Sequence, residues 1–422
     1  MNALKIWIYE DVLKAAERWA DSINAAYDEA EVCIAGKDEV KGLFETLYRR
    51  RSPSRVQGGN PEEWPVHDVD AADVVVLDYD LLEYWKGQTG DTTGSRLAYL
   101  LRCFTECGYI IVLNQYGHNV FDLSLGSPAD NFADLHVSGE QIGNPGLWKT
   151  PFDGYRPWHW PVIPLACENF RKCVNDVAEN LEEDDPKPLI EFLGLNRAID
   201  WMPMQARRFL AGGKKPLEEI TFNDFVNSSH GGVEVKDRDN LRPRQVARVA
   251  ASRISTLLND IIFPAQNALV DAPHLASRFG SVFLINQGGI EDWNKLCDPT
   301  DPGIEHLLDE TLNDHRFANP HWLRRPAWYW PEVNSNENIK EVRDPWSSTE
   351  SQSGWVFCED VSRFVQDEHV LSFRASVSPP FIKRYVCDKH SEEARRSVND
   401  AVDDEPTDLS QVEYVPQSAF IQ

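Results

Sequence analysis

The sequence predicts a doubly wound α/β domain built on a five-stranded parallel sheet, followed by a mainly helical α+β domain. Short apolar runs alternate with amphipathic helical stretches as far as residue 139. This alternation is typical of parallel strands that are joined by right-handed helical crossovers. Beyond the acidic, proline-containing stretch 181–188, helical patterns dominate and strand-like runs appear only late.

The first half of the α/β pattern comprises two strands and two helices. The run Leu4–Tyr9 is almost continuously apolar, as expected for a strand that is buried on both faces, and a second strand-like run covers 31–36. A helix after each run is predicted by apolar residues at helical spacing. The two sets are Val12, Ala16, Trp19 and Ile23, and then Val40, Leu43, Phe44 and Leu47.

The second half continues the pattern, with strands predicted at 73–80, 109–114 and 133–139. A third helical face lies between the first two of these strands, and a closing helix follows the last one. These faces consist of Leu97, Leu100, Leu101 and Phe104, and of Ala166, Phe170, Cys173, Val177 and Leu181.

Four regions follow from these patterns. Residues 1–183 form the α/β domain, and 184–188 form an acidic linker with two prolines, which cannot continue a helix. Residues 189–395 form a helical-rich α+β domain, with a long helix at 242–262 and strands at 354–360 and 369–378. The acidic stretch 396–422 has no apolar period and is predicted to be a mobile tail.

Composition excludes several classes of protein. The chain has 422 residues and a formal net charge of -26, which disfavours a general nucleic-acid binder because such a surface repels phosphates. No run approaches the roughly 18 apolar residues of a membrane span, so we expect no membrane insertion and a cytoplasmic location. The eight cysteines are scattered along the chain, which favours reduced thiols.

Carboxylates follow the ends of two predicted strands. Glu10 and Asp11 come after the first strand, and Asp78 lies at the end of the third. In a doubly wound sheet, ligands bind outside the carboxyl ends of the strands, where the strand order reverses. Hard oxygen ligands suit Mg²⁺, so the sequence predicts a magnesium site formed by Glu10, Asp11 and Asp78.

This order of strands and acids resembles the receiver domain of two-component response regulators. The resemblance covers roughly residues 3–181 and implies the flavodoxin-like strand order. It also implies that Asp78 is the phosphoacceptor, that Glu10 and Asp11 are the metal-binding pair, and that Asn114 ends the fourth strand. Gly94 stands where the family usually has a glycine that opens its third helix.

The chain departs from the receiver pattern in three places. The family has Thr or Ser where this chain has Asn114, and it has a Lys just after the fifth strand, where "HVSGEQIG" offers none. Lys149 lies too far along to replace it, and the connection 51–73 is longer than usual. A receiver that has lost phosphotransfer and binds partners is therefore an alternative to a working receiver.

We expect a regulatory protein rather than an enzyme. Its receiver-like domain would be controlled by Mg-dependent phosphorylation of Asp78 or by partner binding alone, and its C-terminal domain would bind another protein. The resemblance implies a histidine kinase or a related ATPase as partner. One alternative is a receiver-controlled metal-dependent hydrolase or nuclease that uses His315 or His321. Another is a non-catalytic subunit of a host-defence complex.

The predicted long helix at 242–262 carries a stripe of arginines. Its residues Arg242, Arg244, Arg248 and Arg253 recur at helical spacing, and we expect them to pair with carboxylates of the same chain.

Overall fold

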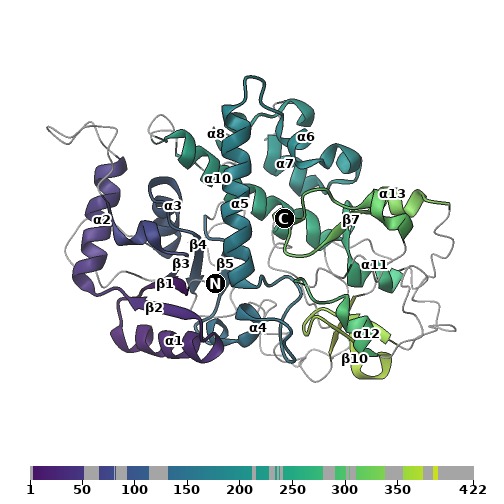
Figure 1. The fold of residues 1–422 in the computed structure, drawn as a ribbon, viewed down its shortest axis with the longest axis horizontal. Helices are drawn as coiled ribbons and strands as arrows, with labels where there is room; N and C mark the ends of the chain where they lie inside the picture. The colour runs from purple at the N-terminus through teal and green to yellow at the C-terminus, as the bar shows by residue number, and fades with distance from the viewer. Residues whose placement is uncertain are drawn as a thin grey trace, which may run out of the picture.

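The computed structural model describes residues 3–51, 66–79, 81, 93–113, 132–211, 215–227, 233–234, 237, 241–278, 290–300, 304, 310–337, 355–373 and 384–387. In Figure 1 the N-terminal sheet and its helices lie on the left, and most of the C-terminal half lies on the right.

One parallel sheet with the strand order β2-β1-β3-β4-β5 forms the N-terminal part. Its strands are β1 (Leu4–Tyr9), β2 (Ala30–Ile34), β3 (Val74–Asp78), β4 (Tyr109–Leu113) and β5 (Leu135–Val137). Every neighbouring pair in the sheet is parallel. The predicted five-stranded doubly wound sheet is therefore confirmed.

Helices cover both faces of this sheet. Because successive side chains of a strand point to opposite faces, β3 sends Val75 and Leu77 into one core, and Val74 and Val76 into the other. The first core contains apolar side chains of α2 (Lys37–Arg51) and α3 (Gly94–Phe104). The second contains those of α1 (Leu13–Ala26) and α4 (Pro145–Trp148).

Two long helices join the sheet to the rest of the chain. Helix α5 (Ile163–Glu182) is the long vertical helix in the middle of Figure 1, and α10 (Pro243–Thr256) packs against both α5 and α3. The Ser252 hydroxyl of α10 donates to Asp134 at 2.9 Å, just before β5. One continuous apolar core contains residues of the sheet, of α5 and of α10.

The C-terminal half is mainly helical with late strands, as predicted, and it also contains a short two-stranded sheet that the sequence patterns did not indicate. A two-stranded antiparallel sheet pairs β6 with β7, and a four-stranded sheet has the order β10-β11-β8-β9. Its helices and helical turns are α6 (Leu189–Leu193), η6 (Leu195–Trp201), α7 (Met204–Ala211), η7 (Leu217–Glu219), α8 (Phe222–Asn227), η8 (Leu257–Ile262), η9 (Phe263–Ala265), α11 (Ala272–Arg278), α12 (Ile290–Lys295), η12 (Glu310–His315), η13 (Pro320–Trp322), α13 (Trp330–Ser335) and η14 (Asp367–His369). Its strands are β6 (Leu269–Asp271), β7 (Ala327–Tyr329), β8 (Trp355–Cys358), β9 (Arg363–Gln366), β10 (Val370–Phe373) and β11 (Arg384–Cys387).

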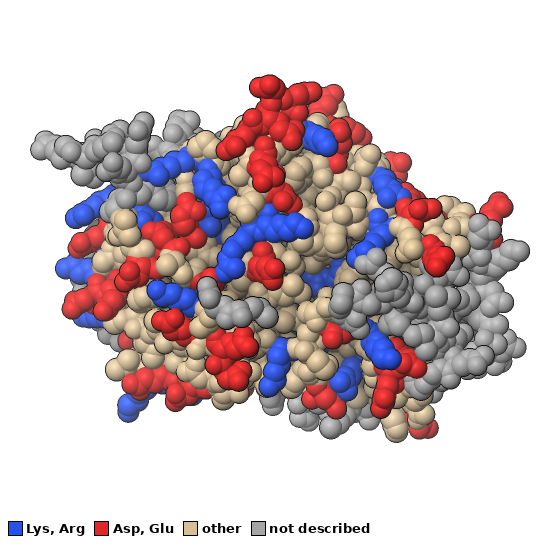
Figure 2. Space-filling view, viewed as in Figure 1, with Lys and Arg blue, Asp and Glu red and all other residues tan. Residues whose placement is uncertain are grey.

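The predicted division of the chain at 184–188 stays a prediction. Helix α5 ends at Glu182 and α6 begins at Leu189, so 183–188 connect the two helices. The exposed acids of this connection gather at the top of the face in Figure 2. The predicted tail 396–422 lies outside the described residues. None of the helices within the described ranges is long and apolar enough to cross a membrane.

The basic stripe is only partly a surface feature. Arg248 and Arg253 are buried, and the Arg253 guanidinium lies 4.7 Å from the ring centre of Phe209. Arg244 is exposed, donates to Asn175 and lies 3.9 Å from a carboxylate oxygen of Glu106. The inner part of the stripe therefore holds α10 against neighbouring elements.

Candidate cation site

The strand order places the predicted acids at the switch point of the sheet. Strand β1 pairs with β2 on one side and with β3 on the other. The strands that follow β2 are therefore added on the opposite side of β1, and the switch point lies between β1 and β3. Glu10 directly follows β1, and Asp78 is the last residue of β3. Both carboxylates therefore lie at the edge where doubly wound sheets bind their ligands.

Three of the four predicted site residues come together at this edge. Carboxylate oxygens of Glu10, Asp11 and Asp78 all lie within 4.8 Å of one another. Glu10 and Asp78 are only 5% and 4% exposed, whereas Asp11 is partly exposed. Asn114, the fourth residue, lies outside the described residues.

The backbone after β1 fixes the position of Glu10. Its Oε1 accepts a hydrogen bond of 2.8 Å from the Val12 amide, just before α1 begins. This amide is one of the donors that a helix start leaves without an intrahelical partner. Glu10 is thus held at the carboxyl end of the sheet.

The charges in the cluster disturb one another. Burial, and next the charge of Asp78, raise the pKa of Glu10 from 4.5 to about 8. Without a cation, Glu10 therefore keeps a proton at neutral pH. A divalent cation would reverse this preference, since it favours the ionised form of each carboxylate that binds it. The oxygen-only donor set suits Mg²⁺ or Ca²⁺ rather than a soft metal.

Helix α3 begins directly against Asp78. The Gly94 amide donates to Tyr79 O at 2.8 Å, and a Cβ atom at Gly94 would lie 2.4 Å from the Asp78 carbonyl oxygen. Since the obstacle is backbone, it cannot rotate away as a side chain could. Only glycine fits at this position, so the start of α3 is coupled to the position of Asp78.

No lysine directly follows β5. The next residues are Ser138, Gly139 and Glu140, and Ser138 and Gln141 exchange two hydrogen bonds of 2.9 and 3.1 Å. These bonds close a local turn and direct neither side chain to the acids. The receiver lysine therefore has no equivalent at this point of the chain.

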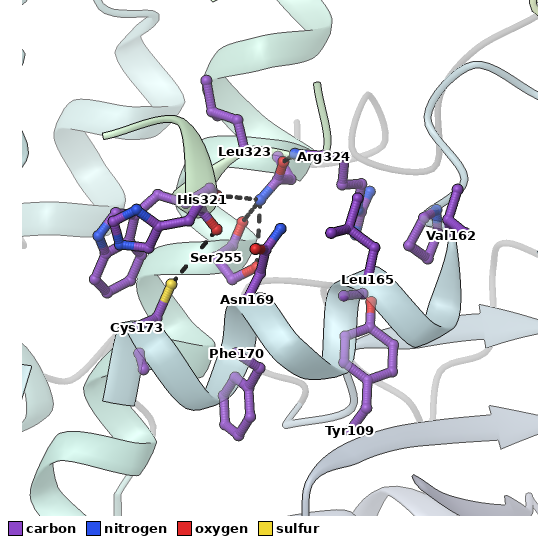
Figure 3. A pocket seen from close by; sticks show the side chains of 15 residues that line it. Tyr109, Val162, Leu165, Asn169, Phe170, Cys173, Ser255, His321, Leu323 and Arg324 are labelled. Atoms are coloured by element: carbon purple, nitrogen blue, oxygen red, sulfur yellow. Dashed lines mark hydrogen bonds between the residues drawn. The ribbon is translucent and has the colours of Figure 1, made fainter. Parts of the chain in front are cut away.

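A shallow hollow lies where α5, α10 and η13 meet. Figure 3 shows Asn169, Ser255, His321 and Arg324 around it. Most of these polar groups already serve the fold. Arg324 donates to Asp260 and to the His159 carbonyl. His321 lies 2.6 Å from Asp176.

The histidines of the hydrolase alternative pair with different carboxylates. His315 contacts Glu332 at 3.0 Å, while His321 contacts Asp176. Within the described part of the chain, the only group of three side chains that could hold a metal is the acidic cluster, which contains neither histidine. This geometry gives no support to a metal-dependent hydrolase at His315 or His321.

The C-terminal half also contains a buried ionic cluster that was not among the predicted sites. His274 contacts Asp271 at 2.5 Å through Nδ1 and Glu359 at 2.9 Å through Nε2. Arg384 also pairs with Glu359, and Trp158 Nε1 donates to it at 2.7 Å. Burial alone would raise the pKa of Glu359, but Arg384 and His274 hold it below its ordinary value.

This cluster is a cross-link between distant segments. In the sequence, only the short spacing of Asp271 and His274 could have indicated this cluster. Glu359 lies 85 residues beyond His274, so no local pattern connects them. His274 is buried, and both of its ring nitrogens face carboxylates. A reacting group would need one of them, so the arrangement is structural.

The fold and the acidic edge together define a doubly wound α/β protein of flavodoxin-like strand order with a candidate site for a hard cation. Comparison of the chain with protein-family models, with curated proteins and with solved structures found no match.

Proposed function

We propose that the chain is a regulatory protein whose receiver-like module binds Mg²⁺ through Glu10, Asp11 and Asp78 and accepts a phosphoryl group on Asp78. The observation that carries this proposal is the convergence of the three carboxylates, within 4.8 Å, at the switch point of the sheet. The order of the strands and the glycine that opens α3 against Asp78 support it further.

The proposed reaction is a transfer to a carboxylate. An Asp78 oxygen forms a bond to phosphorus while the bond from phosphorus to the leaving group breaks, and the leaving group departs with the electron pair of that bond. An imidazole leaving group then takes a proton from the solvent, whereas acetate leaves as the anion. Glu10 and Asp11 would help to hold Mg²⁺, which would offset the negative charge of the phosphoryl oxygens. A histidine kinase or a related ATPase is the phosphodonor that the resemblance implies.

The C-terminal half would carry the output by binding another protein. Glu234 and Asp237 contact helices α2 and α3, which flank the sheet. Asp237 accepts hydrogen bonds from Arg51 of α2 at 2.7 Å and from Tyr99 of α3 at 2.6 Å. Because α3 begins against Asp78, a change at the acidic edge has a short route to these contacts.

Mass analysis tests the proposal. The protein is incubated with Mg²⁺ and acetyl phosphate, and then intact protein and peptides are analysed for wild type, Asp78→Asn and Asp21→Asn. Asp21 is an exposed acid of α1 and serves as the matched control. We expect one hydroxylamine-labile phosphate in wild type and in the control, and none in Asp78→Asn.

If wild type acquires no phosphate, Mg²⁺ binding decides what remains of the proposal. If wild type binds Mg²⁺ but acquires no phosphate, phosphotransfer is refuted and regulation by partner binding alone remains. If it binds no Mg²⁺ either, the cation site is refuted as well. A partner that co-purifies equally with wild type and Asp78→Asn would then favour a non-catalytic subunit of a larger complex.

A further inference from the structure

Arg156 lies in the connection 149–162 between α4 and α5, where this connection meets the C-terminal half. Its amide donates to the Asp360 carbonyl at 2.9 Å, in the turn between β8 and β9. The side-chain stem is enclosed by neighbours, because a Cβ atom at Gly146 would lie 2.9 Å from both Cβ and Cγ of Arg156. The residue is 4% exposed.

The guanidinium of Arg156 lacks partners on one edge. Its Nε and Nη2 are buried and find no hydrogen-bond partner within the part of the chain that the structure describes. Leaving a buried charged donor without an acceptor is costly, so such a group in a folded protein calls for a partner. Burial, and next the charge of Arg325, lower the pKa of Arg156 to about 9, so it remains charged at neutral pH.

A second buried arginine, Arg325, lies close by. The acceptors of its hydrogen bonds are neutral. Arg325 is 3% exposed and donates to the carbonyls of Trp158 at 3.0 Å and Cys297 at 2.7 Å, and to the Ser362 hydroxyl. Its charge is strong enough at Arg156 to lower the pKa of that residue. Arg325 therefore adds positive charge at this junction, partly offset by the buried Asp271, whose pKa His274 and Arg325 lower against the effect of burial.

The carboxylate of Asp298, which acts on Arg156, is occupied elsewhere. Asp298 favours the charged form of Arg156. Its Oδ1, however, accepts hydrogen bonds from Thr150 Oγ1 at 3.0 Å and from the amide and hydroxyl of Thr300 at 2.9 and 2.8 Å. Asp298 does not hydrogen-bond to Nε or Nη2 of Arg156, since neither atom has a partner among the described residues. Asp298 thus offsets part of the charge of Arg156 from a distance and leaves the Nε–Nη2 edge without an acceptor.

The geometry points to a binding site for a small oxyanion, which we propose lies on the Nε–Nη2 edge of Arg156 with Arg325 adding positive charge. The Nε–H and Nη2–H bonds of an arginine are parallel, so they fit two oxygens of one phosphate or carboxylate group. A halide ion has no second atom for this fork. The site is independent of the acidic edge and of the function proposed for it.

Enclosure sets the expected behaviour of the ligand. Both fork nitrogens are buried and present almost no surface to water, so an anion can reach them only after the surrounding protein moves apart. Entry and release would require movement of the connection 149–162, and we expect exchange to be slow. A small anion fits this setting better than a large phosphate ester.

Equilibrium dialysis with radiolabelled inorganic phosphate tests the site directly. The full-length protein is dialysed for days in EDTA at constant ionic strength, so that Mg²⁺-dependent binding at Asp78 does not contribute. We expect one phosphate per chain, displaced by excess unlabelled phosphate, more weakly by acetate, and not by chloride. A folded wild-type protein without saturable phosphate binding would overturn the proposal, whatever the variants do.

Two variants locate the site. Arg156→Met keeps an unbranched apolar stem and removes the guanidinium, and we expect its phosphate affinity to fall at least tenfold. Arg171→Met, which removes an exposed arginine of α5, should bind as wild type does. Unchanged binding by folded Arg156→Met would place the anion elsewhere and refute the assignment.

Thermal unfolding gives an independent readout. Without phosphate, Arg156→Met should melt no lower than wild type, because it lacks the unpaired buried charge. Phosphate should raise the melting temperature of wild type and of Arg171→Met, with equal chloride as the control, but not that of Arg156→Met. If Arg156→Met instead melts lower and wild type ignores phosphate, Arg156 is satisfied by the protein itself and the proposal fails.

Discussion

Replacing Asp78 by asparagine should stabilise the protein at pH 8 in metal-free buffer. Carboxylate oxygens of Glu10 and Asp78 lie within 4.8 Å of each other, and at that separation two unit charges repel by about 1 kcal/mol in a water-like dielectric and by about 3.5 kcal/mol at an effective dielectric of 20. The partly exposed Asp11 indicates that water reaches the site, so we expect a gain of about 1–3 kcal/mol in the free energy of unfolding.

The stability difference between Asp78→Asn and wild type should depend on pH through the ionisation of Glu10. The pKa of Glu10 is raised in the folded protein from 4.5 to about 8. The protonated form is therefore favoured on folding, and its contribution to stability is complete below about pH 4.5 and is lost as the pH rises to about 8. At pH 5 Glu10 is protonated in wild type, so Asp78→Asn should change stability little; the difference should grow up to pH 8.

Urea unfolding followed by tryptophan fluorescence measures this effect at pH 5, 7 and 8, with EDTA or with Mg²⁺. Saturating Mg²⁺ should stabilise wild type by about 2.7 kcal/mol at 100 times its Kd, and the variant less. Asp21→Asn serves as the control for loss of one negative charge. A difference between Asp78→Asn and wild type that is equal at pH 5 and pH 8, or equal stabilisation of both by Mg²⁺, would refute the reasoning.

Further predictions concern the surroundings of the site and the contacts of α3. Gly94→Ala should destabilise the protein by about 2–3 kcal/mol and weaken Mg²⁺ binding, because its Cβ would meet the Asp78 carbonyl. Gly42→Ala in α2, where no atom lies within 4 Å of the added carbon, should instead gain about 0.5–1 kcal/mol, and thermal unfolding that gave both variants the same sign would contradict this. Asp237→Asn should cost about 2–3 kcal/mol, since it disrupts a buried carboxylate that pairs with Arg51. Asp224→Asn, which removes an exposed pair with Lys215, should cost less than about 1 kcal/mol in the same urea titration, and equal losses would show that burial of Asp237 does not matter.

Local patterns were enough to predict the sheet and its acidic edge. An apolar run such as Leu4–Tyr9 reads as a strand because both of its faces are buried, and the helical spacing that follows it leaves few topologies open. Once the strands are parallel, residues at their carboxyl ends, such as Glu10 just after β1 and Asp78 at the end of β3, must lie at one edge. The sequence by itself therefore determined the fold class and the neighbourhood of these acids.

Contacts between distant segments could not be predicted in this way. The sequence shows Arg248 as part of a basic helical stripe, but the packing of α10 against α3 and α5 buries it. His274 meets Glu359 across 85 residues, and Arg156 lies beside a turn some 200 positions further along the chain. No local period links such positions. Only tertiary packing decided which charges are buried, which of them are paired, and where a buried guanidinium presents a free edge.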